Sequence, residues 1–154
     1  MIKLKKILVP TDFSDFSHLA FQYGLSFCRE YQAEMTFLHV IEDPFYPSTG
    51  GSFGFDMGGF FEKMEEESQK KMDELLTPDL TEGVSIQRMI SRGTPFLEII
   101  RVAKEQDSDM IVLATHGRTG LAHVLMGSVT ERVVRKAPCP VLVVRKAQHE
   151  FIMP

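Results

Sequence analysis

The stretch THGRTGLAHVLMGS, residues 115–128, combines three glycines, two histidines and an arginine with no acidic residue. Such a stretch could hold a phosphate, because glycine lets an anion approach the backbone and a helix start offers unpaired N–H groups. Ser128 adds a hydroxyl donor, and Arg118 could reach a phosphate. A simpler interpretation also fits, since glycines make turns, Ser128 and Glu131 have capping-box spacing, and Arg118 suits a solvated loop. Both interpretations stay open.

A second candidate is Asp12, in the run Pro10-Thr11-Asp12 that follows an apolar segment. Its carboxylate could accept hydrogen bonds from ribose hydroxyls or ligate a metal. It could equally close an Asx-type turn before the first helix.

Several other chemistries lack their motifs. There is no GxxxxGK[ST] phosphate loop, no GxGxxG after the first apolar run and no GxSxG nucleophile turn. His18 and His39 show no metal-ligand spacing, and His123 suits the surface. Cys28 and Cys139 are expected to be two reduced thiols rather than a disulfide framework.

The elements that must position these residues alternate in type. Apolar runs predict strands, and three- and four-residue apolar spacing or a Thr-Pro start predicts helices. The expected strands are residues 5–9, 35–41, 84–90, 110–114 and 141–144, and the expected helices are residues 14–32, 60–76, 94–106 and 128–136.

This alternation predicts an α/β fold, a doubly wound five-stranded parallel sheet with helices on both faces, Rossmann-like in architecture. A strand order of 3-2-1-4-5 would make the first and fourth strands neighbours whose connections leave in opposite directions. That switch point opens a crevice at the carboxyl ends of the strands, where Asp12 and residues 115–128 would face each other.

Bulk composition sets wider limits. The 154 residues suit one domain, expected over residues 1–146 with a tail at 147–154. The net charge of −4 argues against nucleic acid, and no apolar run reaches membrane-span length, so we expect a soluble cytoplasmic protein. The triplet at residues 65–67 is expected to be a solvated acidic helix face. Residues 44–59, with five glycines and several aromatics, suit a surface loop, a lid or a partner contact.

Four segments resemble the universal stress protein (Usp) family over nearly the whole chain: KKILVPTDFS, FLHVIE, RGTPFLEII and LATHGRTGLAHVLMGSVTERVVRKAPCPVLVVR. The resemblance implies the same five-stranded fold, usually as a homodimer. Nucleotide-binding members carry G-x2-G-x9-G-[ST]. Here Gly117, Gly127 and Ser128 match that motif, but Ala114 replaces its first glycine. The added methyl group either crowds the nucleotide or is tolerated if the backbone at Ala114 is extended.

The resemblance also implies a site for ATP, or AMP or ADP, with Mg²⁺ carried by the nucleotide and met by Asp12. The protein alone is expected to offer no metal site. The phosphates would meet Gly117, Gly127, Ser128, Val129 and Thr130. The ribose and adenine side would meet Pro10, Thr11, Asp12 and the backbone of Val40, and Leu113, Ala114, His116 and Arg118 complete the expected set.

The last expected strand is apolar on both faces and lies at an edge of the sheet. Pairing with a second copy would cover that edge, so we expect a homodimer through Val141, Leu142, Val143 and Val144. Three functions remain: a nucleotide-binding dimer that responds to stress or energy state, a slow ATPase, and a nucleotide-free stress protein that acts through protein contacts. No acidic residue occurs in residues 110–130, which disfavours a catalytic base from that loop.

Overall fold

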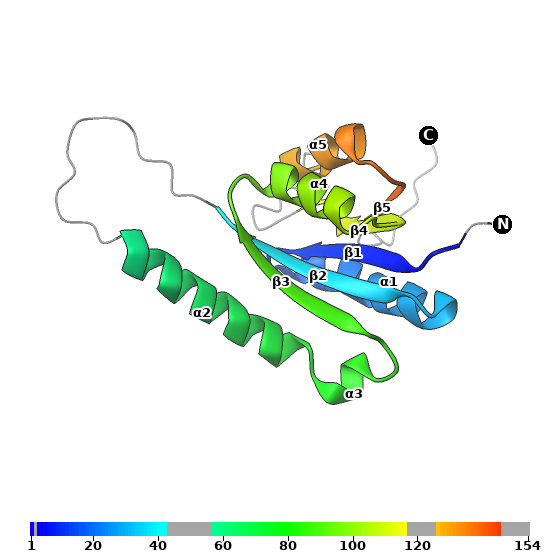
Figure 1. Cartoon of the computed structure of the whole chain (residues 1–154), viewed down its shortest axis with the longest axis horizontal. Coiled ribbons are helices and arrows are strands. Elements are labelled where there is room, and N and C mark those ends of the chain that lie inside the picture. Colours follow the sequence, from blue (N-terminus) through cyan, green and yellow to red (C-terminus); the bar gives the residue numbers. More distant parts are fainter. Residues whose placement is uncertain (2, 43–56, 117–125, 146–154) are drawn as a thin grey trace, which may run out of the picture.

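The computed structural model describes residues 1, 3–42, 57–116 and 126–145. It contains a five-stranded parallel sheet of order β3-β2-β1-β4-β5, as expected (Figure 1). The strands are β1 (Lys6–Thr11), β2 (Glu34–Ile41), β3 (Ile86–Arg92), β4 (Met110–Ala114) and β5 (Val141–Val144). The helices are α1 (Asp15–Tyr31), α2 (Met57–Leu75), α3 (Pro78–Thr81), α4 (Pro95–Glu105) and α5 (Ser128–Lys136). The predicted domain boundary at residue 146 remains a prediction.

Helices cover both faces of the sheet: α1 and α2 lie on one face, and α4 and α5 on the other (Figure 1). Two apolar clusters fill the layers. Phe21, Phe37 and Met72 belong to the cluster under α1 and α2, while Leu8 and Ile99 belong to the one under α4 and α5. Each such side chain contributes about 1.5–3 kcal/mol when fully buried. The whole of β4 is buried, as the unbroken apolar run predicts for a central strand.

The first strand was predicted to end at residue 9, before Pro10, but β1 continues to Thr11. Every residue of β1, from Lys6 to Thr11, is in register with a residue of β2. The register pairs of β1 with β4 are limited to Ile7 and Leu8. Proline lacks an N–H and is tolerated where a strand is unpaired on one side. The carboxyl ends of β1 and β4 therefore separate beyond Leu8.

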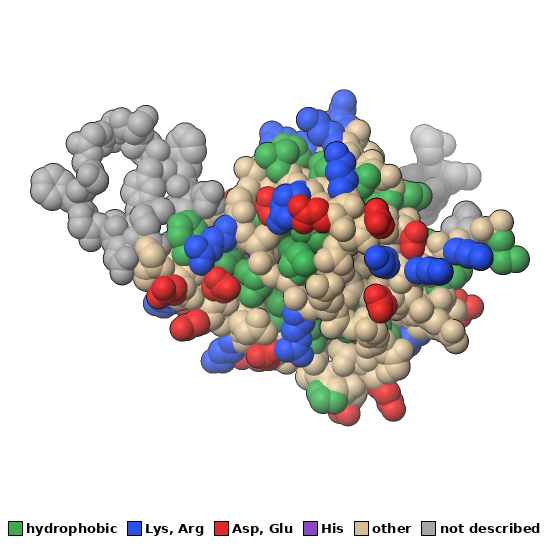
Figure 2. Space-filling view, viewed as in Figure 1, with side chains coloured by type: hydrophobic (Ala, Val, Ile, Leu, Met, Phe, Trp, Pro, Cys, Tyr) green, Lys and Arg blue, Asp and Glu red, His purple; other side chains and the backbone are tan. Residues whose placement is uncertain are grey.

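Two exposed ion pairs join α2 to the edge strand β3. Arg88 pairs with Asp73, and Arg92 pairs with Glu65 at 2.9 Å while its guanidinium lies 4.7 Å from the centre of the Phe61 ring. Basic and acidic side chains accordingly lie side by side over α2 and β3 (Figure 2).

Some helix bounds differ from those predicted. The second long helix begins at Met57 rather than at residue 60, so the last glycines of the 44–59 segment are helical; residues 44–56 lie outside the described residues. The short helix α3 was not predicted at all. It begins with Pro78, and Arg29 of α1 donates a 2.7 Å hydrogen bond to the carbonyl of Leu80 within it. No helix in the described parts of the chain is long and apolar enough to cross a membrane.

Candidate functional site

The register pairs between β1 and β4 stop at Leu8, so the carboxyl ends of these neighbouring strands lie at the switch point of the sheet, where open α/β sheets are expected to have a crevice for a ligand. Asp12 follows β1 on one side. On the other side β4 ends at Ala114, and α5 begins at Ser128. The fold therefore brings the end of β1, the end of β4 and the start of α5 to the same edge of the sheet, and the predicted facing of Asp12 and residues 115–128 stays a prediction because residues 117–125 lie outside the described residues.

Asp12 forms the Asx-type turn that was one of its two interpretations. Its Oδ1 accepts hydrogen bonds from the N–H of Ser14 at 3.0 Å and from the Ser14 hydroxyl at 2.6 Å. Ser14 in turn caps α1 by accepting from the N–H of Ser17 at 3.2 Å. These hydrogen bonds orient the Asp12 carboxylate at the end of β1.

Thr11 holds this turn in place rather than presenting its hydroxyl to the crevice. Thr11 is only 8% exposed. Its Oγ1 accepts a hydrogen bond from the N–H of Phe13 at 3.0 Å and lies 3.1 Å from the Ser17 hydroxyl oxygen. His39, which sequence reasoning set aside, lies buried on β2 with its Nδ1 2.8 Å from the Thr11 carbonyl. Its ring packs against that of Phe13, with 4.5 Å between centroids. A polar residue inside the apolar strand FLHVI was the only available signal for this role.

The start of α5 is tied to the end of β4 by two short hydrogen bonds. The buried Thr130 hydroxyl donates to the Ala114 carbonyl at 2.7 Å, and the Gly127 N–H donates to the Thr115 carbonyl at 2.7 Å. The first helical turn is thereby held next to the crevice.

The capping-box interpretation of Ser128 and Glu131 is wrong. Gly127 occupies the N-cap position, with φ −67°, and within the described residues no side chain caps α5. Ser128 is the first helical residue and is exposed, while the Glu131 carboxylate pairs with Arg135 at 2.9 Å. Because a helix start leaves N–H groups without intrahelical partners, α5 presents donors and a partial positive charge here.

Ala114, the departure from the family motif, lies within β4 in register with Val144 and is not among the residues with positive φ. Its side chain is 7% exposed and belongs to the core cluster under α1. The backbone is therefore extended, and the additional methyl group packs into the core.

The other expected site residues divide into four groups. Leu113 is buried in the cluster under α4 and α5, and the half-buried Val129 packs against it. Pro10 and Val40 are half-buried near the ends of β1 and β2. His116 lies just after β4, with its ring 5.7 Å from that of Phe16. Gly117 and Arg118 lie outside the described residues, as does His123.

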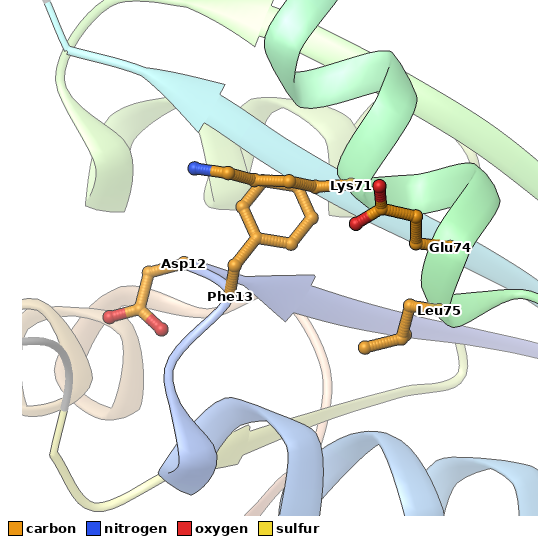
Figure 3. Close-up of a pocket in the computed structure, with 5 residues that line it drawn as sticks. All are labelled: Asp12, Phe13, Lys71, Glu74 and Leu75. Carbon is orange, nitrogen blue, oxygen red and sulfur yellow. The ribbon is translucent and has the colours of Figure 1, made fainter.

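A pocket of about 520 Å³ adjoins Asp12 on the side of α2. Its lining residues are Asp12, Phe13, Lys71, Glu74 and Leu75. The Lys71 side chain crosses the Phe13 ring, with the ammonium 5.6 Å from the ring centre, and the Asp12 carboxylate points away from both (Figure 3). Phe13 adopts a left-handed φ of 62°, which is uncommon for a bulky residue. No group of three or more potential metal ligands occurs in the described segments.

Comparison with known proteins gives a consistent result. The model of the universal stress protein family matches residues 3–145. The chain is 34% identical over 146 residues to universal stress protein MJ0531 of Methanocaldococcus jannaschii, covering 95% of this chain and 85% of that protein. It is 32% identical over 157 residues to universal stress protein MJ0577 of the same organism, covering 94% and 97%.

Solved structures agree with the sequence comparison. The structure of MJ0577 superposes with a TM-score of 0.77 at 31% identity and covers 96% of this chain and 99% of its own. Two more distant structures, each 20% identical, share the fold. One is a universal stress protein in complex with cAMP, with a TM-score of 0.58 over 92% of this chain and 97% of its own. The other, from Archaeoglobus fulgidus, is in complex with dAMP, with a TM-score of 0.62 over 93% and 98%.

Proposed function

The chain belongs to the universal stress protein family, and from this premise we propose that it binds ATP with Mg²⁺ in the crevice between β1 and β4. The observation that carries the proposal is the start of α5, which no side chain of the described residues caps and which is held beside the end of β4. The contrast with α1 is informative, because Ser14 caps that helix. Phosphate groups can accept hydrogen bonds from the N–H groups of a first helical turn, and the helix dipole favours their negative charge.

The residues fit a nucleotide in a definite order along the crevice. The N–H groups of the first turn of α5 and the exposed Ser128 hydroxyl would meet the phosphates. Asp12 would meet the ribose side or the nucleotide-borne Mg²⁺, and the backbone of Val40 would meet the adenine. Thr11 and Thr130 would act by positioning, since their hydroxyls already bond within the protein. Bound Mg²⁺ would neutralise phosphate charge.

Ala114 supports this assignment. Its methyl group lies in the core and its backbone is extended, so neither steric crowding nor a strained φ follows from the departure from the motif. The adenine nucleotides in the two fold relatives, cAMP and dAMP, support the same ligand class.

We further propose that the protein is a binding and signalling module rather than an ATPase, and that it works as a homodimer through β5. Hydrolysis needs a base or a positioned water beside the terminal phosphate. In the described part of the crevice, the candidates are Asp12 and His116, and Asp12 already accepts two hydrogen bonds from Ser14. The edge position and apolar sequence of β5 support the dimer.

The test is to denature freshly purified protein and identify any released nucleotide by chromatography, beside a Gly127→Val variant. ATP from the wild type and none from the variant is the expected result. A micromolar site corresponds to about −8 kcal/mol. ATP-Mg at 100 times Kd would then add about 2.7 kcal/mol of stability, which is a rise of roughly 5–11 °C in Tm.

An Ala114→Gly variant is the matched control, because it restores the family motif without touching α5. We expect it to bind ATP with an affinity within a few-fold of the wild type. No released nucleotide, together with no rise in Tm at millimolar ATP-Mg, would refute nucleotide binding. Phosphate release that disappears in Asp12→Asn while ATP stays bound would instead establish an ATPase.

A further inference from the structure

The helix α1 exposes three aromatic side chains in a row, Tyr23, Phe27 and Tyr31, which we call the aromatic stripe. Tyr23 is 48% exposed and Tyr31 is 47% exposed, while Phe27 is half-buried between them. The rings of Phe27 and Tyr31 are stacked, with 6.2 Å between centroids and 16° between planes. Gathered apolar surface of this kind is typical of an interaction site.

The aromatic stripe lies on the flank of α1 that faces β5. Phe16, seven residues before Tyr23 and thus on the same flank, places its ring 5.7 Å from that of His116, just after β4. Arg29, on the opposite flank, reaches the α3 carbonyl of Leu80. Phe27 and Leu142 of β5 also pack against one core cluster. Because α1 also contacts β5, the stripe lies on the side of the molecule that carries the β5 edge.

We propose that a second copy of this chain covers the aromatic stripe, so that α1 supplies the second part of the dimer interface; this inference rests on the β5 pairing proposed above. Four residues of β5 span only about 13 Å. A stable interface needs about 800 Å² on each partner. The two exposed tyrosines adjoin that edge and supply apolar area that the strand lacks.

The geometry of a two-fold dimer explains why the stripe is aromatic. Antiparallel pairing of β5 with its copy, about an axis perpendicular to the sheet, leaves both α1 helices on the same face. The helix packs over β1 and β4. With strands about 4.8 Å apart, the two α1 axes would lie about 19 Å apart. Directly packed helices are separated by only about 8–10 Å. Long aromatic side chains from both copies can fill the remaining gap, whereas alanine or leucine would leave it open.

The experiment measures the dimer dissociation constant by sedimentation equilibrium, with and without ATP-Mg. The test variant carries Tyr23→Gln and Tyr31→Gln, which preserve helix propensity and remove only exposed rings. The matched control is Leu97→Gln, an apolar side chain on α4 that is 53% exposed. Val143→Lys tests the β5 pairing separately. Circular dichroism melting confirms that each variant folds.

We expect the double tyrosine variant to raise the dissociation constant by about 30-fold or more, since buried aromatic anchors dominate interfaces. The Leu97 control should match the wild type. If the double variant dimerises as tightly as the wild type while Val143→Lys is monomeric, the inference is overturned and the β5 pairing stands. A wild type that remains monomeric at every concentration overturns both, and nucleotide release then still decides the ligand proposal.

Discussion

Thr130 offers a sharp test of how the site is built, because its hydroxyl donates a 2.7 Å hydrogen bond to the Ala114 carbonyl in a position 5% exposed. Thr130→Val keeps the shape of the side chain and removes the donor. Leaving a buried carbonyl without its partner costs about 1–3 kcal/mol. Each kcal/mol lowers the Tm of a chain this size by about 2–4 °C. We therefore expect the ligand-free variant to melt roughly 2–12 °C below the wild type.

The assay is thermal unfolding followed by circular dichroism on nucleotide-stripped protein, with Thr130→Ser as the control that retains the hydroxyl. Thr130→Ser should lose less stability than Thr130→Val, because serine can still donate to the carbonyl. A Thr130→Val protein that melts with the wild type yet no longer binds ATP would refute the reasoning. In that case the hydroxyl serves the ligand rather than the joint between β4 and α5.

Three further predictions follow from packing and protonation. Gly24→Ala should lower the free energy of unfolding in urea by about 1–3 kcal/mol, because the new Cβ would lie 2.7 Å from Val9 Cγ2; a stabilised variant would mean that helix propensity outweighs packing. Burial raises the pKa of the Cys28 thiol from 9.0 to about 12. The folded protein thus keeps a proton that the unfolded chain loses, so stability should fall as pH rises from 9 toward 12, and urea titrations of Cys28→Ala should show a weaker fall. Ser128→Ala should leave the ligand-free Tm unchanged, since Ser128 does not cap α5; a drop of several degrees would restore the capping interpretation.

The alternation of strand and helix patterns predicted the parallel α/β sheet, and the unbroken apolar run of β4 predicted a strand covered on both faces. The periodic segments are long enough for their type, strand or helix, to be assigned even where a single residue is ambiguous. The prediction that β1 ends before Pro10 failed for a tertiary reason: the strand loses its β4 neighbour before it reaches the proline. The sequence shows that Pro10 has no N–H to donate to a neighbouring strand. It does not show whether a neighbouring strand lies beside Pro10 to accept that hydrogen bond.

The candidate site residues stay a prediction, while the structure corrects the hydrogen-bonding roles of several residues at the ends of helices and strands. Thr94 occupies the N-cap position of α4, yet its side chain makes no capping hydrogen bond. Ser128 has capping-box spacing, but Gly127 occupies the N-cap position of α5, and its N–H donates to the Thr115 carbonyl. His39 becomes a support of the Asp12 turn only because β2 pairs with β1 in one register, which places it opposite Thr11. Each role depends on a hydrogen-bond partner or a neighbouring strand that is distant in the sequence, and the spacing of residues along the sequence does not identify it.

The two ion pairs between α2 and β3 have matching spacings along the helix and along the strand. Arg88 and Arg92 are four strand residues apart, about 13 Å, and their partners Asp73 and Glu65 are eight helix residues apart, about 12 Å. The two repeats match only when the helix runs antiparallel to the strand, and a slip of one helical turn, about 5.4 Å, breaks both pairs together. Pairs this exposed contribute little to stability. Their consequence is positional: both pairs can form together in only one setting of α2 along the sheet, and in that setting Lys71 lies over the Phe13 ring.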